Sequence, residues 1–192
     1  MRVSRVQAEE NRQAVINASG RLFREHGFDG IGLKDLMKGA GLTQGAFYKQ
    51  FASKEDLAAQ ASKRAMESAA QLWAVATAAN PDDPLGAVLG FYLSMEHRQE
   101  KMDGCPIAAL GSDAARQSST VKEAFETGIR AYLETLGTMI SVTPGEETNG
   151  KAMAILSTML GALMLSRVVN DPELAQGFLT AAERQIREVV AS

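Results

Sequence analysis

The sequence predicts an all-α protein of about nine helices, and three observations lead to this prediction. Apolar side chains recur at spacings of three and four residues along most of the 192 residues. No stretch alternates apolar and polar residues strictly enough to propose a strand. Capping residues, prolines and glycines divide the chain at intervals that suit helices. The composition, 45% hydrophobic and 22% charged, supplies apolar material for a core and excludes a disordered or collagen-like chain.

The first third of the chain predicts one longer helix followed by two short ones. The apolar spacing indicates a helix over about 6–26, which Gly27 is placed to end. A helix of about two turns follows, with Leu33, Leu36, Met37 and Ala40 on its buried face, and Gly39 and Gly41 close it. Thr43 is the expected N-cap of the next helix, which runs to Phe51. Two short helices therefore flank a tight, glycine-containing turn.

Capping signals place the remaining helices. The expected N-caps are Ser53 for a helix to about Ala79, Asp83 for 85–102, Cys105 for the helix that Pro106 starts, Thr120 for 121–140, and Asp171 for a last helix to about Val190. Residues 141–150 are rich in turn formers and predict a loop. The apolar run over 152–166 predicts a buried helix, because about 15 apolar residues fall short of the roughly 20 that a membrane span needs.

Charge is distributed unevenly along the chain. The whole sequence carries a formal charge of −3, which by itself argues weakly against binding to nucleic acid. Residues 1–64, however, hold 11 basic against 7 acidic side chains, a balance of +4, whereas residues 65–192 hold 9 against 16, a balance of −7. A basic N-terminal third is the electrostatic footprint of a nucleic-acid-binding unit.

The helix, turn and helix of this basic part follow the organisation of a helix-turn-helix DNA reader. The stretch from Gly27 to Leu57, GFDGIGLKDLMKGAGLTQGAFYKQFASKEDL, closely resembles the DNA-binding domain of the TetR family of bacterial transcriptional regulators. The matching positions are Gly27-Phe28, Ala40-Gly41-Leu42-Thr43, Gly45, Tyr48, Phe51, and Ser53-Lys54-Glu55 with Leu57. One departure is Ile31-Gly32, where the family usually has Thr or Ser. The resemblance implies a DNA-binding domain over 1–52 and a ligand-binding and dimerisation domain over 53–192.

The resemblance also implies which side chains contact DNA. Gln44 opens the recognition helix, where its amide can pair with an adenine edge, and Gly45 lets the backbone approach closely. The expected DNA-binding residues are Lys34, Thr43, Gln44, Gly45, Tyr48, Lys49 and Lys54. The alternative for the polar members of this set is a solvated surface without a DNA contact, whereas Phe47 and Phe51 are expected in the core.

TetR-like regulators typically hold an inducer in their C-terminal helices and dimerise through the last two. Here those helices are 152–167, with Met153, Leu156, Leu160 and Leu163 at helical spacing, and 172–190. Candidates to line a ligand cavity are Trp73, Phe91, Tyr92, Met95, Cys105, Phe125 and Tyr132. The alternative for these side chains is a packed core without a ligand. His97 is either a polar anchor or an exposed side chain.

Cys105 is the only cysteine, which excludes an internal disulfide and a cysteine-rich zinc site. Its expected position at a helix N-terminus favours the reactive thiolate. Residues 104–116 also resemble, less specifically, a branch of the family whose members sense reactive electrophiles through a cysteine. The alternative is a small, buried core residue.

These features predict a ligand-responsive repressor that acts as a homodimer on double-stranded DNA, at a pseudo-palindromic operator, and is released by a small-molecule inducer or by thiol modification. We expect no catalytic residue, no cofactor, no bound metal and no membrane contact. A cytoplasmic location is expected because no apolar segment follows the basic N-terminal residues. The alternatives are a helical protein-interaction adaptor without DNA binding, and an enzyme that uses Cys105 as its nucleophile with only His26 or His97 as a base.

Overall fold

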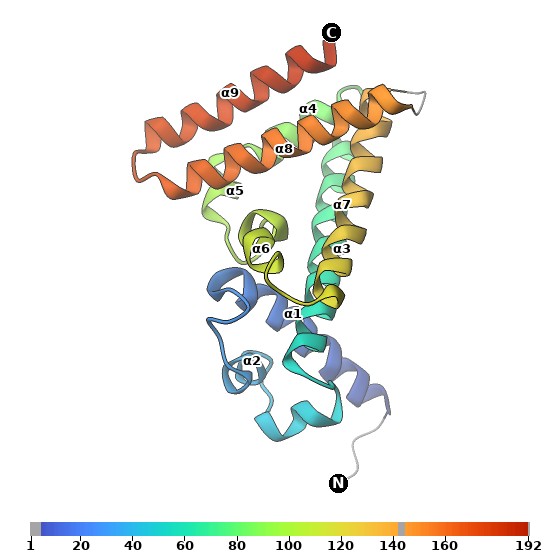
Figure 1. Ribbon diagram of the computed structural model, residues 1–192, viewed down its shortest axis with the longest axis vertical. Coiled ribbons are helices and arrows are strands. Elements are labelled where there is room, and N and C mark those ends of the chain that lie inside the picture. The colour runs from blue at the N-terminus through green and yellow to red at the C-terminus, as the bar shows by residue number, and fades with distance from the viewer. Residues whose placement is uncertain (1–4, 142–144, 192) are drawn as a thin grey trace. The chain divides into compact units, whose positions relative to one another are not determined.

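The structure is a computed structural model, and it describes residues 5–141 and 145–191. Over these ranges it contains nine α-helices, one 3-10 helix and no strand, which confirms the all-α prediction (Figure 1). The elements are α1 (Arg5–His26), α2 (Leu33–Gly39), the 3-10 helix η1 (Gln44–Lys49), α3 (Lys54–Ala79), α4 (Pro84–Tyr92), α5 (Met95–Gln99), α6 (Pro106–Ala114), α7 (Ser119–Ile140), α8 (Glu146–Val168) and α9 (Pro172–Ala191).

Several helix ends lie where the sequence places them, because their caps are local. Gly27 ends α1 with a φ of +77°, a value that glycine adopts without strain. Ser53 Oγ accepts the backbone N–H of Asp56 at 3.0 Å at the start of α3. Asp83 Oδ1 accepts the backbone N–H of Gly86 at 2.9 Å. Asp171 Oδ1 accepts the backbone N–H of Glu173, also at 2.9 Å. These three N-caps are confirmed.

Other boundaries differ from the prediction. The single helix expected over 85–102 is wrong, because α4 ends at Tyr92 and Ser94 caps a separate helix, α5, with its Oγ accepting the His97 N–H at 3.1 Å. Thr120 is not an N-cap, since α7 begins before it, at Ser119. The expected loop is shorter than predicted because α8 already begins at Glu146. Residues 142–144 of that loop lie outside the described part.

The chain separates into two compact units, which differ from the predicted split at residue 52. The first joins the chain up to Ser68 to Cys105–Thr127, so it includes α6 and the beginning of α7. The second joins Ala69–Gly104 to the chain from Gly128 onward. The predicted domains, 1–52 and 53–192, were defined by their expected functions, whereas these units are defined by compact packing. The functional division therefore stays a prediction.

The core of the first unit is built largely from aromatic rings. Phe28 lies 5.2 Å from the ring of Phe23, which α1 contributes, and 6.5 Å from that of Phe125, at the start of α7. Leu36 and Met37 of α2 are fully buried in the same cluster. Helix α2 packs against α1, and η1 packs against α2.

In the second unit α9 runs along α8 (Figure 1). Helix α8 is long and apolar enough to span a membrane by length and composition alone, a property that core helices of soluble proteins share. Its buried face includes Leu156 and Leu163, so these two residues are not available for the predicted dimer contact. Met153, in contrast, is 55% exposed. A helix that is apolar on all sides gives no periodicity from which to choose the outward face.

Two arginines of the second unit cap each other's helix. Arg98 donates to the carbonyl oxygens of Ser166 and Val169 at 2.7 and 2.9 Å, near the end of α8. Arg167, in α8, donates to three carbonyl oxygens around the end of α5, those of His97, Arg98 and Glu100, at 2.8, 3.1 and 2.9 Å. The last carbonyl groups of a helix lack partners within it, and each guanidinium supplies donors for the other helix.

Candidate DNA-binding interface

The turn between α2 and η1 has the geometry of a Schellman motif. Gly41 has a φ of +71°, and its N–H donates to the carbonyl of Lys38 at 2.9 Å. The N–H of Leu42 reaches back to the carbonyl of Met37, also at 2.9 Å. Only glycine adopts this backbone conformation without strain, which explains the glycine in the turn. The motif ends α2 sharply and fixes the direction in which η1 leaves.

The predicted recognition helix over 43–51 is shorter and more tightly wound than expected. It is the 3-10 helix η1, and the N–H of Ala46 donates to the carbonyl of Thr43 at 3.0 Å, three residues back. Short helices commonly adopt this form, and Gly45 is a poor α-helix former. Thr43 does occupy the N-cap position, but its side chain makes no capping hydrogen bond, so its predicted capping role is wrong.

The side chains of η1 divide cleanly into a buried and an exposed side. Phe47 is fully buried and stacks on Phe51 with ring centres 5.6 Å apart. Tyr48 is 70% exposed, although its ring meets the edge of Phe47 at 5.2 Å. The predicted DNA-binding residues of this segment, Thr43, Gln44, Gly45, Tyr48 and Lys49, are all exposed. The aromatic pair thus supports a continuous polar surface from beneath.

The two remaining lysines of the predicted interface lie on neighbouring helices of the same unit. Lys34 is exposed in the first turn of α2. Lys54 is half-buried as the first residue of α3, where backbone N–H groups without helical partners favour an anion. The capping arrangement beneath it is reciprocal, because Asp56 Oδ2 accepts the N–H of Ala52 at 3.0 Å while Ser53 caps Asp56.

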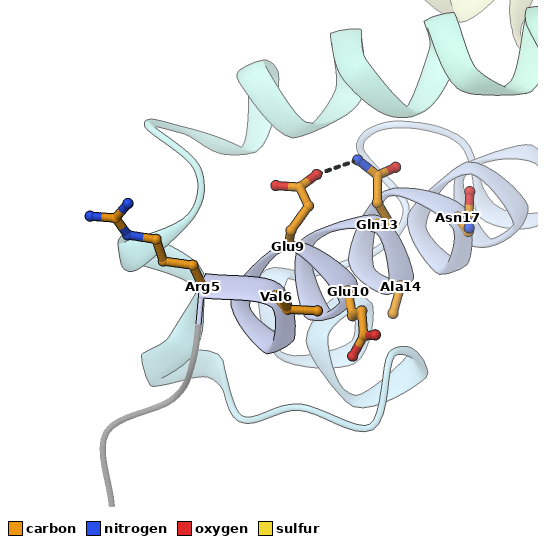
Figure 2. Close-up of a pocket in the computed structure, with 7 residues that line it drawn as sticks. All are labelled: Arg5, Val6, Glu9, Glu10, Gln13, Ala14 and Asn17. Atoms are coloured by element: carbon orange, nitrogen blue, oxygen red, sulfur yellow. Dashed lines mark hydrogen bonds between the residues drawn. The ribbon is translucent and has the colours of Figure 1, made fainter.

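An open depression of about 750 Å³ lies on the outer face of the first half of α1, and Figure 2 shows its lining. Arg5 and Val6 lie at one end, and Gln13 donates to Glu9 Oε1 at 2.8 Å along one side of α1. All its lining residues come from α1. A depression walled by one helix cannot enclose a ligand, so it does not compete with η1 as a candidate site.

The structure separates the predicted ligand-binding residues into two groups. In the second unit Trp73 stacks on Tyr132 with ring centres 4.6 Å apart and meets Tyr92 edge-on at 6.1 Å, and all three are buried. Phe91 and Met95 of the same unit are half-buried. Phe125 instead packs in the core of the first unit. Cys105, also assigned to the first unit, is 3% exposed, and its side chain makes no capping hydrogen bond.

His97 is buried, which the sequence left open because its neighbours Glu96 and Arg98 are charged. Its ring stacks on Phe91 with centres 5.5 Å apart, and Nδ1–H donates to the carbonyl oxygen of Tyr92 at 2.8 Å. Burial lowers the pKa of His97 below its ordinary value; the bond to Tyr92 opposes this shift and nearby Arg167 adds to it. The neutral ring is therefore the favoured form at neutral pH.

Within 5–141 and 145–191, no three His, Cys, Asp or Glu side chains form a group that could hold a metal ion. The site described above consists of exposed polar and basic side chains over an aromatic support. Such a surface suits contact with a polyanion.

Comparison with known proteins assigns this surface to a family. Residues 15–61 match the family model of the bacterial regulatory proteins of the tetR family, and this match includes α2, the turn and η1. The HTH-type transcriptional regulator LmrA of Bacillus subtilis (strain 168) is 25% identical over 162 residues, which cover 82% of this chain and 86% of LmrA. AcrR of Shigella flexneri, also an HTH-type transcriptional regulator, is 31% identical over 87 residues, 45% of this chain and 40% of AcrR.

The whole chain also resembles solved structures. A TetR transcriptional regulator from Chloroflexus aurantiacus J-10-FL superposes with a TM-score of 0.78 at 27% identity, over 94% of this chain and 96% of that one. The likeness therefore extends through the C-terminal helices and is not confined to the residues that match the family model. The match over residues 15–61 and the likeness along the rest of the chain together support a DNA-binding transcriptional regulator of the tetR family.

Proposed function

We propose that this regulator is a homodimeric repressor that binds a pseudo-palindromic operator and is released by a small-molecule inducer. The observation that carries the proposal is the surface of η1, where five polar or glycine residues in the range 43–49 are exposed over two buried phenylalanines. A rigid support under exposed donors is what specific base contact requires, because loosely held side chains lose entropy on binding.

Within this surface the proposed roles differ. Gln44 is assigned a base edge, since its amide can donate and accept at adenine. Gly45 is exposed, and a Cβ built there would meet no atom within 4 Å, so the backbone has room to approach the DNA. Tyr48 and Lys49 face the groove or its phosphates. Thr43, Lys34 and Lys54 are assigned phosphate contacts, which position the protein without reading sequence.

The proposed dimer forms through α8 and α9. Their exposed large apolar side chains, Met153, Met164, Leu165, Val168 and Leu174, are from 44% to 79% exposed. Exposed apolar side chains gathered on two adjacent helices are typical of a protein-protein contact. Two copies related by a two-fold axis would present their η1 segments to half-sites separated by whole turns of DNA, about 34 Å or a multiple.

For the inducer we propose a mainly apolar or aromatic molecule that binds against the cluster of aromatic rings in the second unit. Trp73, Tyr92 and Tyr132, with Phe91 and Met95 beside them, offer aromatic faces, and Tyr also offers a hydroxyl. The inducer would act by binding more tightly to the dimer conformation whose two DNA-binding units no longer match the operator spacing. A regulator of this kind works beside the chromosome, which places it in the cytoplasm.

Three alternatives, a thiol sensor, a Cys105-dependent enzyme and an adaptor, have less support. The thiol of Cys105 is buried, so neither an electrophile nor a substrate reaches it without local opening of the structure. Alkylation of the purified protein, with Cys105→Ser as the control, tests the thiol sensor: unchanged DNA affinity after modification excludes it. The adaptor hypothesis gives no reason for an exposed polar surface on a helix-turn-helix.

A gel-shift titration tests DNA binding directly, with the DNA upstream of the protein's own coding region as probe. Lys49→Ala and Lys54→Ala should each weaken binding and reduce the slope of log affinity against log salt by about one unit. Lys63→Ala is the matched control, because it removes the same charge from an exposed position further along α3. Binding that is independent of salt would favour the adaptor. Equal weakening by all three changes would contradict the phosphate contacts assigned to Lys49 and Lys54.

A further inference from the structure

A chain of side-chain contacts joins α1 to the segment between η1 and α3. Arg12, half-buried on α1, donates from its guanidinium to Gln60 Oε1 of α3. The central carbon of the same guanidinium lies 5.4 Å from the ring centre of Phe51. A flat guanidinium can stack on a ring while its N–H groups donate in the plane, which an ammonium group cannot do. Arg12 therefore makes two contacts at once, one with each neighbouring element.

The contact continues from Gln60 into the start of α3. Gln60 Nε2 donates to Asp56 Oδ1 at 2.7 Å, and the second oxygen of that carboxylate accepts the N–H of Ala52 at 3.0 Å. The N–H of Asp56 in turn donates to Ser53 Oγ at 3.0 Å. The polar groups linked in this way would otherwise need water as a hydrogen-bond partner. Linked hydrogen bonds also polarise and strengthen one another. The result is a fixed path from Arg12 to the backbone of Ala52.

The short connection between η1 and α3 comprises residues 50–53. Arg12 contacts its Phe51 directly and reaches its Ala52 through Gln60 and Asp56 of α3. Phe51 is also the ring on which Phe47 stacks, and Phe47 supports Tyr48. Lys49 lies just before this connection and Lys54 just after it. The helix that carries Arg12 is itself held in the core, since Val15 and Ile16 are buried. The position of the connection on α1 therefore sets the position of the exposed side chains on both sides of it.

We propose that Arg12 is a positioning residue for DNA recognition, which acts through Phe51 and through the Gln60–Asp56–Ala52 chain rather than by touching DNA. The inference rests on the proposed DNA-binding role of η1. It goes beyond that role because it assigns a function to residues of α1 and α3 outside the recognition segment. A surface held in one arrangement before binding loses less entropy when it docks on the operator, and this gain applies to the specific complex.

A direct phosphate contact by Arg12 is the competing explanation, and substitutions separate the two. Arg12→Lys keeps the charge but loses the planar stack and the fork of donors. Gln60→Met keeps the length of the side chain and removes its hydrogen bonds without changing charge. If Arg12 acts by charge alone, both variants should bind like the wild type. If it positions the connection, both should lose affinity, and their effects should not add, because they interrupt the same path.

The experiment uses the full-length protein and two probes: a duplex that the wild type selects from a random-sequence pool, and a scrambled duplex of the same length and composition. Arg12→Lys and Gln60→Met should each weaken binding to the selected duplex by about tenfold, and the double variant by little more. Binding to the scrambled duplex should change less than about twofold, since phosphate contacts dominate it. Gln71→Met, an exposed glutamine further along α3, is the matched control and should bind like the wild type.

Wild-type affinity for the selected duplex in either variant, or losses that multiply in the double variant, would overturn the positioning role. An equal loss on both duplexes by a folded variant would also overturn it, because positioning should favour the specific complex. Far-ultraviolet circular dichroism at the assay temperature shows whether each variant is folded. Gln60→Ala provides a second removal of the same hydrogen bonds and should behave like Gln60→Met. If the wild type itself does not distinguish the two duplexes, the proposed function fails and not only this inference.

Discussion

The reciprocal arginine caps of the second unit give a prediction whose size follows from the structure. Arg167→Ala removes three hydrogen bonds, to the carbonyl oxygens of His97, Arg98 and Glu100. A net value of about 1 kcal/mol for each bond gives a loss of about 3 kcal/mol in the free energy of unfolding. Arg98→Ala removes two such bonds and should cost about 2 kcal/mol by the same reasoning.

Arg187→Ala is the matched control. This arginine also has charged partners, with Glu183 at 3.0 Å and Asp83 at 3.6 Å, and its hydrogen bond to Glu183 raises its pKa. Its side chain is 49% exposed, however, so water and salt screen both ion pairs. An exposed pair of this kind contributes about 0.5 kcal/mol. The three substitutions remove the same guanidinium from different surroundings.

Urea unfolding at fixed protein concentration measures the three effects, followed by circular dichroism at neutral pH. With a slope of about 2–3 kcal/mol per molar urea, Arg167→Ala should lower the unfolding midpoint by about 1 M. Arg98→Ala should lower it by somewhat less, and Arg187→Ala by about 0.2 M. A midpoint for Arg167→Ala equal to that for Arg187→Ala would refute the idea that hydrogen bonds to backbone carbonyl groups, rather than charge pairs, stabilise the junction of α5 and α8.

Three further predictions concern single positions. Gly41→Ala should cost about 1–2 kcal/mol because of its positive φ. Gly27→Ala should cost about as much, since Asp113 Oδ2, 2.6 Å from the new Cβ, is the end of a side chain that can turn away; a much lower urea midpoint for Gly27→Ala than for Gly41→Ala would contradict this. Asp83→Ala should lose about 1 kcal/mol of stability through its helix cap, whereas Asp83→Asn should retain most of it in the same urea assay. Below pH 6.5 the histidine of the unfolded chain binds a proton, whereas buried His97 of the folded protein resists protonation. The free energy of unfolding should therefore decrease as the pH is lowered, by at most about 1.4 kcal/mol per pH unit. His97→Gln should weaken this pH dependence of the urea midpoint, and an unchanged dependence would contradict the explanation.

Features that depend on a few adjacent residues were predictable from the sequence. Asp83 and Asp171 cap their helices through N–H groups two or three residues away, so their roles are visible in the local sequence. Gly27 and Gly41 follow the same principle, because the backbone conformation that ends a helix is confined to one residue. The all-α class and the helix-turn-helix arrangement followed from such signals.

Local patterns failed where several structures suit the same residues. The sequence between Leu85 and Met102 is compatible with one helix, and the break appears only because Ser94 caps a new one. The apolar spacing of residues 43–51 is compatible with either an α-helix or a 3-10 helix. Over so short a segment the periodicity of the sequence does not distinguish the two.

The sequence by itself determined the helical class, the N-caps at Ser53, Asp83 and Asp171, and the exposure of the polar side chains of η1, because these depend on interactions within about one turn. The tertiary structure decided which apolar residues of α8 face inward, that Phe125 belongs to the core of the first unit, and that Arg12 meets Gln60, 48 residues away. Those contacts join segments distant in the chain, and their energies depend on how the helices pack against each other, which no local pattern of residues records.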